Sequence, residues 1–154
     1  MPDSASIDRR KLMRFLGAKV LLTPASEGGT GAYKKAQDLV RANGWFYARQ
    51  FENTANADIH EQTTGIEIFN DFKEMGLDYF VSGYGTGGTF TGVARVLKEK
   101  MPKTKLIITE PDVAPLLASN VEQERDENGS PMVSLPKSKP HPIQGWNTDF
   151  IAVV

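Results

Sequence analysis

The amino-acid sequence predicts an α/β fold with a parallel sheet, and two observations support this prediction. Over the first 48 residues, segments whose apolar residues recur at helical spacing alternate with short apolar segments of strand length, in the order helix, strand, helix, strand. The connections between these segments are short, as expected when helices cross back between parallel strands. Further along, another apolar strand leads through a glycine-rich loop into a helix and repeats the arrangement.

The first half of the chain is expected to form two helices and two strands. A helix over 4–16 ends at Gly17, which is a natural C-terminal stop. The apolar run 19–23 is typical of a buried strand, and a second amphipathic helix then ends near Gly44. Residues 45–48 form the next predicted strand. These elements supply the first part of the predicted sheet and of the helices that cover it.

The second half repeats the alternation and then loses it. The expected elements are a helix over 56–73, a strand over 77–81, a helix over 90–101, a strand over 106–109 and a final strand over 150–154. Residues 119–140 carry acidic residues, glycine and prolines without periodicity. This connection is longer than compact domains usually contain. We interpret it as a loop insertion that is either mobile or a functional flap.

Composition and charge argue against several classes of function. Eighteen basic and nineteen acidic residues among 154 give a net charge of −1, so no electrostatic field favours nucleic acid or an anionic membrane. No apolar run reaches the ~18 residues of a membrane span, and the N-terminus lacks the apolar core of a signal peptide. The absence of cysteine and the distance between His60 and His141 argue against disulfides and a metal site, and favour a cytoplasmic setting.

The strongest functional signal is a glycine-rich stretch at residues 81–92, between the strand predicted over 77–81 and the helix that follows. Glycines allow a tight turn and a close approach of a ligand to the backbone. The first N–H groups of the helix have no internal acceptor, and the peptide dipoles add partial positive charge there. The stretch therefore predicts a phosphate-binding site.

The spacing of the glycines leaves the identity of the phosphate open. Gly83, Gly85 and Gly88 satisfy the dinucleotide fingerprint, and Glu110 follows at the distance expected for a ribose-binding acid. Interleaved threonine hydroxyls, by contrast, suit a terminal monophosphate with its three acceptor oxygens. These hydroxyls belong to Thr86, Thr89 and Thr91. The stretch lacks the Gly-Lys-Ser/Thr of a triphosphate site, which disfavours an ATPase, and a glycine-rich turn without a ligand is the remaining alternative.

A polar segment at residues 49–54 follows the strand predicted over 45–48. Ligands of parallel α/β sheets gather at the carboxyl ends of the strands, so polar side chains in this segment are candidates for ligand binding. The alternative is a solvated loop in which Asn53 or Asn56 caps the next helix. Both interpretations stay open at the level of the residues alone.

Five short motifs, spread over the chain, add a resemblance to a known family. They are the stretch 1–18, the stretch 50–65 with Gln50-Phe51-Glu52-Asn53, the loop Gly85-Thr86-Gly87-Gly88-Thr89-x-x-Gly92, Glu110-Pro111, and His141-x-Ile143-Gln144-Gly145. In this order they resemble the cysteine synthase (O-acetylserine sulfhydrylase) and cystathionine β-synthase family of fold type II pyridoxal 5′-phosphate enzymes. The resemblance covers the chain apart from the insertion 119–140.

The resemblance implies a more specific fold than the periodicity does. The α/β architecture would consist of the parallel three-layer α/β/α sheets of the fold type II family, similar to the tryptophan synthase β subunit, and would be incomplete at both ends. Residues 1–50 would form the second half of a smaller N-terminal domain. Residues 51–154 would form the first half of a larger domain that binds pyridoxal phosphate, with the loop insertion at 119–140.

The resemblance also implies a cofactor, pyridoxal 5′-phosphate, and a site for it. The cofactor phosphate would be held by Gly85, Thr86, Gly87, Gly88 and Thr89. The side-chain amide of Gln50 would bind the carboxylate of the amino-acid substrate, Phe51 would shape the pocket, and Gly145 would border the substrate on the opposite side. On this interpretation Glu110 is a structural residue at the end of a strand rather than a ribose ligand.

The family reaction is β-replacement on an activated serine, in which O-acetylserine and sulfide give cysteine, and the full-length enzymes resembled are homodimers. The family's Schiff-base lysine lies upstream of the residues that Met1 matches, and its serine at the pyridine nitrogen lies downstream of residue 154. We therefore expect a central fragment of a lyase or transferase, without a catalytic residue of its own and inactive in isolation. The alternatives are a nicotinamide dinucleotide-binding domain and a non-catalytic binding piece on the same fold.

Overall fold

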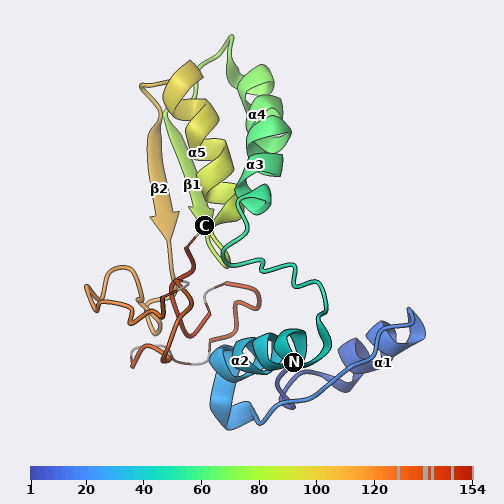
Figure 1. Cartoon of the computed structure of the whole chain (residues 1–154). Coiled ribbons are helices and arrows are strands. Elements are labelled where there is room, and N and C mark those ends of the chain that lie inside the picture. The colour runs from blue at the N-terminus through green and yellow to red at the C-terminus, as the bar shows by residue number, and fades with distance from the viewer. Residues whose placement is uncertain (128, 137–138, 140, 147, 154) are drawn as a thin grey trace.

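The structure, a computed structural model, describes residues 1–127, 129–136, 139, 141–146 and 148–153 (Figure 1). Its helices and strands are, in chain order, α1 (Ile7–Phe15), a short 3-10 helix (Ala25–Glu27), α2 (Gly28–Asn43), α3 (Ala55–Gln62), α4 (Thr64–Phe72), β1 (Tyr79–Gly83), α5 (Gly88–Lys100) and β2 (Lys105–Thr109). Within the described part of the chain, no helix is both long and apolar enough to cross a bilayer.

Strands β1 and β2 lie side by side as a parallel pair, in a register that joins Tyr79 to Lys105 and Gly83 to Thr109. Helix α5 is the crossover between the two strands, and α3 and α4 pack against it (Figure 1). The α/β class and the parallel arrangement are thus confirmed for this part of the chain. Both strands and α5 begin and end within two residues of the predicted bounds.

The predicted helix over 56–73 is wrong as a single helix, because the structure breaks it at Thr63 into α3 and α4. Thr63 has φ −122° and ψ −80°, outside the helical region. Thr63 and Thr64 are β-branched and Gly65 follows them, so three weak helix formers stand in a row. Gly65 also allows α4 to approach α5, since a Cβ there would lie 2.7 Å from Cγ2 of Val96.

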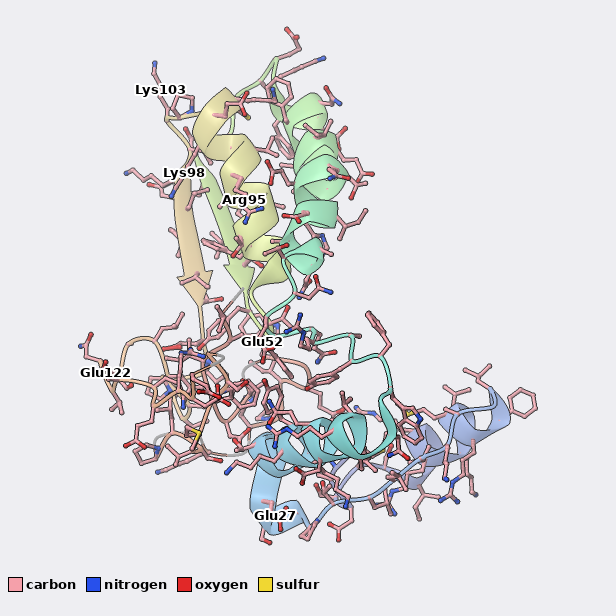
Figure 2. The ribbon with its side chains drawn as sticks, viewed as in Figure 1. Glu27, Glu52, Arg95, Lys98, Lys103 and Glu122 are labelled. Atoms are coloured by element: carbon pink, nitrogen blue, oxygen red, sulfur yellow. The ribbon has the colours of Figure 1, made fainter. Side chains whose placement is uncertain are left out.

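Helices α3 and α5 are packed closely enough that their backbones nearly touch. A Cβ on Gly92 of α5 would lie only 2.7 Å from the backbone nitrogen of Glu61 on α3. Leu97 of α5 is fully buried. On the surface, Arg95 pairs with Asp58 and Glu61 of α3 at 2.9 Å each, and Figure 2 shows it on α5. This packing determines where α3 side chains meet the start of α5.

Both helices predicted in the first half are confirmed. Helix α1 follows Ser6, whose side chain accepts a hydrogen bond from the backbone N–H of Arg9 at 3.4 Å. Helix α2 ends at Asn43 and is followed by Gly44, which adopts the left-handed conformation with φ 65°. Figure 1 shows α1 and α2 apart from the unit formed by α3, α4, α5 and the two strands.

The strands predicted over 19–23 and 45–48 are wrong. Thr23 forms only an isolated bridge with Pro2, and Phe46 is 90% exposed. A strand is stabilised by hydrogen bonds and side-chain pairs from a neighbouring strand. Among the described residues neither segment has such a neighbour, so its apolar pattern alone does not produce a strand.

The segment 119–140 has no helix or extended strand among its described residues, in agreement with its lack of periodicity. It is nevertheless packed against the rest of the protein. Ser130 is buried, and its hydroxyl lies 2.8 Å from the hydroxyl of Tyr33 on α2. Gln37 Nε2 donates to the same Ser130 oxygen at 3.1 Å. Ser130 thus joins this segment to α2, and both interpretations of the insertion, as mobile or as a functional flap, stay predictions.

The strand predicted over 150–154 is wrong for residues 150–153, and Val154 lies outside the described residues. Phe150 is 1% exposed and meets the ring of Phe51 edge-on, with 4.9 Å between ring centroids. At this end of the described chain Phe150 is therefore buried against Phe51, and residues 150–153 do not pair in a sheet.

Candidate functional site

The glycine loop, defined here as residues 85–89, joins β1 to α5 as predicted. Strand β1 ends at Gly83 and α5 begins at Gly88, with Gly87 in the left-handed conformation at φ 93° and ψ −14°. Glycine adopts that conformation without steric cost. The first N–H groups of α5 have no acceptor within the helix, so the junction offers hydrogen-bond donors and partial positive charge to an anion.

The side-chain amide of Asn56, on α3, connects the glycine loop to the segment that precedes α3. Its Nδ2 atom donates to Oγ1 of Thr86 and to the carbonyl oxygen of Gln50, each at 2.8 Å. Thr86 Oγ1 also accepts a hydrogen bond from the backbone N–H of Gly88 at 3.2 Å. A Cβ on Gly88 would overlap the Asn56 amide, so the first position of α5 accommodates only glycine.

His60 lies one helical turn after Asn56 and contacts the same loop. Its Nε2 atom lies 3.1 Å from Oγ1 of Thr89, and its Nδ1 atom lies 2.9 Å from Oγ1 of Thr64 at the start of α4. Residues four apart share one face of a helix. Helix α3 therefore contacts both threonine hydroxyls of the loop, that of Thr86 through Asn56 and that of Thr89 through His60.

Gly145, predicted to border the substrate, lies against the glycine loop. Its carbonyl oxygen would be 2.6 Å from a Cβ on Gly85, and its own φ of 88° favours glycine. The indole ring of Trp146 covers Gly83, where a Cβ would overlap the ring. The structure thus brings the backbone at 145–146 to the end of β1, although the two are far apart in the sequence.

Gln50 and Phe51 lie where the chain passes from α2 to α3, and they line a hollow of about 290 Å³ beside α2. Gln50 is exposed, and its carbonyl is held by Asn56. Phe51 packs against Phe150, and its carbonyl accepts a hydrogen bond from the backbone N–H of Val153 at 2.9 Å. The Gln50 carbonyl is therefore linked to the glycine loop through Asn56, while Phe51 joins this segment to the C-terminal segment.

In the solvated-loop alternative for residues 49–54, Asn53 or Asn56 caps the next helix. The N-cap residue of α3 is Thr54, but the Asn53 side chain does bond to the first N–H of the helix. Oδ1 of Asn53 accepts a hydrogen bond from the backbone N–H of Ala55, at the start of α3, and Nδ2 donates to the carbonyl of Ala48, both at 3.1 Å. Asn56 does not cap the helix, because its amide is bonded to the glycine loop.

Glu110, just after β2, is engaged by protein groups on both carboxylate oxygens. Oε2 accepts from the Tyr84 hydroxyl and from the backbone N–H of Leu117, each at 3.0 Å, and Oε1 accepts from the backbone N–H of Ala118 at 2.9 Å. Burial raises the pKa of Tyr84, and the hydrogen bond to Glu110 raises it further. Tyr84 therefore remains a donor at neutral pH, and Glu110 has the structural role expected at a strand end.

Sequence reasoning missed the binding of a carboxylate, that of Asp149, at the start of α2. The Asp149 carboxylate accepts hydrogen bonds from the backbone N–H of Thr30 (3.1 Å), its hydroxyl (2.8 Å) and the hydroxyl of Ser134 (2.5 Å). The available signal was the run Gly28-Gly29-Thr30-Gly31 at a helix start. Its partner lies 119 residues away from Thr30, which no local pattern reveals.

A parallel strand pair with a helical crossover, and a glycine loop at the start of that helix, defines an α/β protein whose strand–helix junction presents backbone N–H donors. Comparison with known families identifies the protein further. The family model described as "Pyridoxal-phosphate dependent enzyme" matches residues 1–152. The chain belongs to this family.

Curated relatives and solved structures agree with the family. The chain is 45% identical over 153 residues to a cysteine synthase of a Flavobacterium species, and 40% identical over 151 residues to a cysteine synthase of Staphylococcus aureus. Each alignment covers 98% of this chain and 44% of the relative. The chain therefore spans less than half the length of these relatives.

Two solved structures show the same fold over 99% of the chain. O-ureido-L-serine synthase superimposes with a TM-score of 0.85 at 38% identity, and 43% of it is covered. The O-acetylserine dependent cystathionine β-synthase from Helicobacter pylori superimposes with a TM-score of 0.78 at 36% identity, and 44% of it is covered.

The predicted resemblance, the fold type II α/β class and the cofactor class are confirmed by these matches. The nicotinamide-dinucleotide alternative is not supported, because the matched family is dependent on pyridoxal phosphate.

Proposed function

We propose that this chain carries the cofactor-phosphate site and part of the substrate site of a pyridoxal-phosphate-dependent enzyme of the cysteine synthase type. The proposed reaction is β-replacement on an activated serine, in which O-acetylserine and sulfide give cysteine. The observation that carries the proposal is the junction of β1 and α5, whose loop is bonded to the Asn56 amide on α3.

The proposed phosphate ligands fit a monophosphate. They are Gly85, Thr86, Gly87, Gly88 and Thr89. The backbone N–H groups at the helix start and two hydroxyls supply several donors for three phosphate oxygens. Glycine at residue 88 is also needed for packing, because a side chain there would overlap Asn56. This donor set supports a phosphate at the glycine loop.

On the substrate side, we assign to Gln50 the binding of the amino-acid carboxylate, through its exposed side-chain amide. Phe51 lines the same hollow as Gln50. Gly145, which lies against the glycine loop, would border the substrate on the opposite side. Support comes from Asn56, whose Nδ2 atom bonds both the Gln50 carbonyl and the Thr86 hydroxyl. The Asn56 amide thus fixes the backbone of Gln50, the proposed carboxylate ligand, relative to the glycine loop. When bound, pyridoxal phosphate supplies the electron sink for the reaction. The residues of this chain would bind and orient the cofactor phosphate and the substrate carboxylate.

For the whole protein, we propose the family's two-domain organisation and a homodimer. Residues 1–50 would belong to the smaller domain, and residues 51–154 to the larger domain that binds the cofactor. The separation of α1 and α2 from the unit of α3, α4, α5 and the strands supports a boundary near residue 50 (Figure 1).

The proposal is tested by ligand-dependent thermal unfolding of the 154-residue chain. Pyridoxal phosphate, pyridoxal and NAD⁺ are compared at equal concentrations. A ligand that binds the folded chain raises its melting temperature. Pyridoxal carries the same aldehyde, so it controls for reaction with surface lysines. We expect a rise with pyridoxal phosphate that exceeds the rise with pyridoxal. A rise with NAD⁺ and none with pyridoxal phosphate would refute the proposal.

A further inference from the structure

We propose that His60 is a positioning residue that orients the hydroxyl of Thr89 toward the bound phosphate. In this arrangement His60 is the middle member of a hydrogen-bond chain that runs in one direction, from the Thr64 hydroxyl through the imidazole to the Thr89 hydroxyl. The inference rests on the proposed function of the glycine loop as a phosphate site and adds two residues to it.

The imidazole of His60 lies within hydrogen-bond distance of both the Thr64 and the Thr89 hydroxyls. His60 Nδ1 lies 2.9 Å from Oγ1 of Thr64, and Nε2 lies 3.1 Å from Oγ1 of Thr89. Helix α3 is held there by close packing on α5, since a Cβ on Gly92 would lie 2.7 Å from Cβ of His60. Thr64 reaches Nδ1 because α3 ends just before Thr63 and α4 begins just after it.

The direction of this series of hydrogen bonds follows from the number of protons that each hydroxyl and the imidazole can donate. The Thr89 hydroxyl has a single proton, which it must donate to the phosphate if it is a ligand. Its oxygen must then accept from His60, which requires a hydrogen on Nε2. In a neutral imidazole Nδ1 is then an acceptor, and its donor is the Thr64 hydroxyl. Successive donors that point the same way polarise one another toward the anion.

The opposite direction gives a different site. If Nδ1 carried the hydrogen, it would donate to Thr64, and Nε2 would accept the proton of Thr89. The Thr89 hydroxyl would then be unable to donate to a phosphate. The tautomer of His60 therefore decides whether Thr89 is a ligand. The Thr64 hydroxyl can pair with Nδ1 in either tautomer, and in the productive one it is the donor to Nδ1.

Substitution of Thr64 tests this without altering His60 or the glycine loop. Thr64→Val keeps the shape and removes the hydroxyl. We expect it to weaken binding of pyridoxal phosphate and of inorganic phosphate about three- to tenfold, as for loss of one hydrogen bond, and to leave pyridoxal binding unchanged. Thr63→Val is the matched control. The Thr63 hydroxyl donates to the Ile59 carbonyl at 2.6 Å and takes no part in the hydrogen bonds from Thr64 through His60 to Thr89. Thr64→Ser retains the hydroxyl and is expected to bind like the wild type.

Two substitutions of His60 separate its role in positioning from its role in packing. In His60→Gln the amide nitrogen reaches the position of Nε2, so the donor to Thr89 is retained and most of the phosphate affinity should remain. In His60→Asn the amide is too short to reach Thr89, and the affinity should fall as in Thr64→Val. Equal losses in both variants would contradict positioning by a donor at Nε2.

The tautomer itself is read by nitrogen NMR of ¹⁵N-histidine-labelled chain saturated with inorganic phosphate. We expect His60 to carry its hydrogen on Nε2 in the wild type. A hydrogen on Nδ1, or Thr64→Val that binds phosphate as tightly as the wild type, would overturn the role of His60 and leave the phosphate site intact. A wild-type chain that binds pyridoxal phosphate no more tightly than pyridoxal would overturn the proposed function and this inference together.

Discussion

The side-chain amide of Asn56 fills the position that a Cβ on Gly88 would take. The two residues belong to helices α3 and α5, and the amide also holds the hydroxyl of Thr86. The start of α5, where the phosphate is proposed to bind, is therefore shaped by a side chain from another helix. Each residue of this contact can be tested separately.

Gly88→Ala is expected to destabilise the chain by about 1–3 kcal/mol, as for overpacking of a tight contact, and to reduce the affinity for pyridoxal phosphate. Urea unfolding and equilibrium dialysis measure the two effects. The second variant is Asn56→Ser combined with Gly88→Ala, in which the smaller neighbour relieves the overlap. Gly88→Ala should cost less stability in the Asn56→Ser background than in the wild type. Equal costs in both backgrounds would mean that Asn56 is not the residue that excludes a side chain.

Asn56→Ala removes the donor shared by the Thr86 hydroxyl and the Gln50 carbonyl. We expect a loss of about 1–3 kcal/mol in the free energy of unfolding and weaker binding of pyridoxal phosphate, because Thr86 is no longer held. Asn43→Ala is the matched control, since Asn43 donates to the Leu39 carbonyl at 2.8 Å on the exposed end of α2. A loss of phosphate affinity as large in the control would contradict the role of Asn56.

Asp149→Asn is expected to loosen the C-terminal segment from the start of α2. The carboxylate accepts from the backbone N–H and the hydroxyl of Thr30, and an amide at this position is a weaker acceptor without the charge that favours a helix start. We expect a loss of about 1–2 kcal/mol in the free energy of unfolding. Hydrogen exchange should show faster exchange of the Thr30 amide. Asp112→Asn, at an exposed position, is the control, and unchanged exchange at Thr30 would speak against the contact.

Glu52 gives a prediction for the dependence of stability on pH. Burial raises the pKa of the Glu52 carboxyl above its ordinary value of 4.5, and the nearby charge of Asp126 raises it further, against the opposing effects of Ser130 and Arg125. Glu52 is labelled in Figure 2 and accepts a hydrogen bond from the Tyr33 hydroxyl.

A carboxyl with a raised pKa holds its proton more tightly in the folded chain. Its stabilising contribution is therefore complete below the unfolded pKa and is lost as the pH rises through the folded pKa. The stability of Glu52→Gln relative to the wild type should increase as the pH rises from about 4 to about 6. Urea unfolding across this range measures the difference, with exposed Glu67→Gln as the reference. A difference that stays constant or falls with pH would contradict the raised pKa.

The parts of the fold that were predictable are those in which the local pattern and the tertiary neighbours agree. Strands β1 and β2 and helix α5 were predictable because their partners lie within a short stretch of chain: the strands pair with each other, and Phe80 of β1 stacks on Phe90 of α5. The segments 19–23 and 45–48 have the same kind of apolar pattern, but pairing depends on a neighbouring strand that the pattern does not contain. The break at Thr63 arises from three weak helix formers, a local signal that the apolar spacing of 56–73 obscured.

For the site, the glycine loop was predictable because it depends on backbone conformation, and a glycine such as Gly87, with its positive φ, indicates that conformation directly. The spacing of Asn56 and His60, four residues apart, was visible in the sequence and could have indicated a shared helix face. What that face contacts was not visible. Likewise, the contact of Asp149 with Thr30 joins residues 119 positions apart.

The sequence by itself determined the chemistry on offer: a strand, a glycine loop and a helix start that suits a phosphate, within motifs that identify the family. Only the tertiary structure decided which side chains support that loop, because close packing of α3 on α5 at Gly92 brings Asn56 to Thr86 and His60 to Thr89. Backbone conformation is encoded locally, whereas the partners of a hydroxyl depend on which helices pack together.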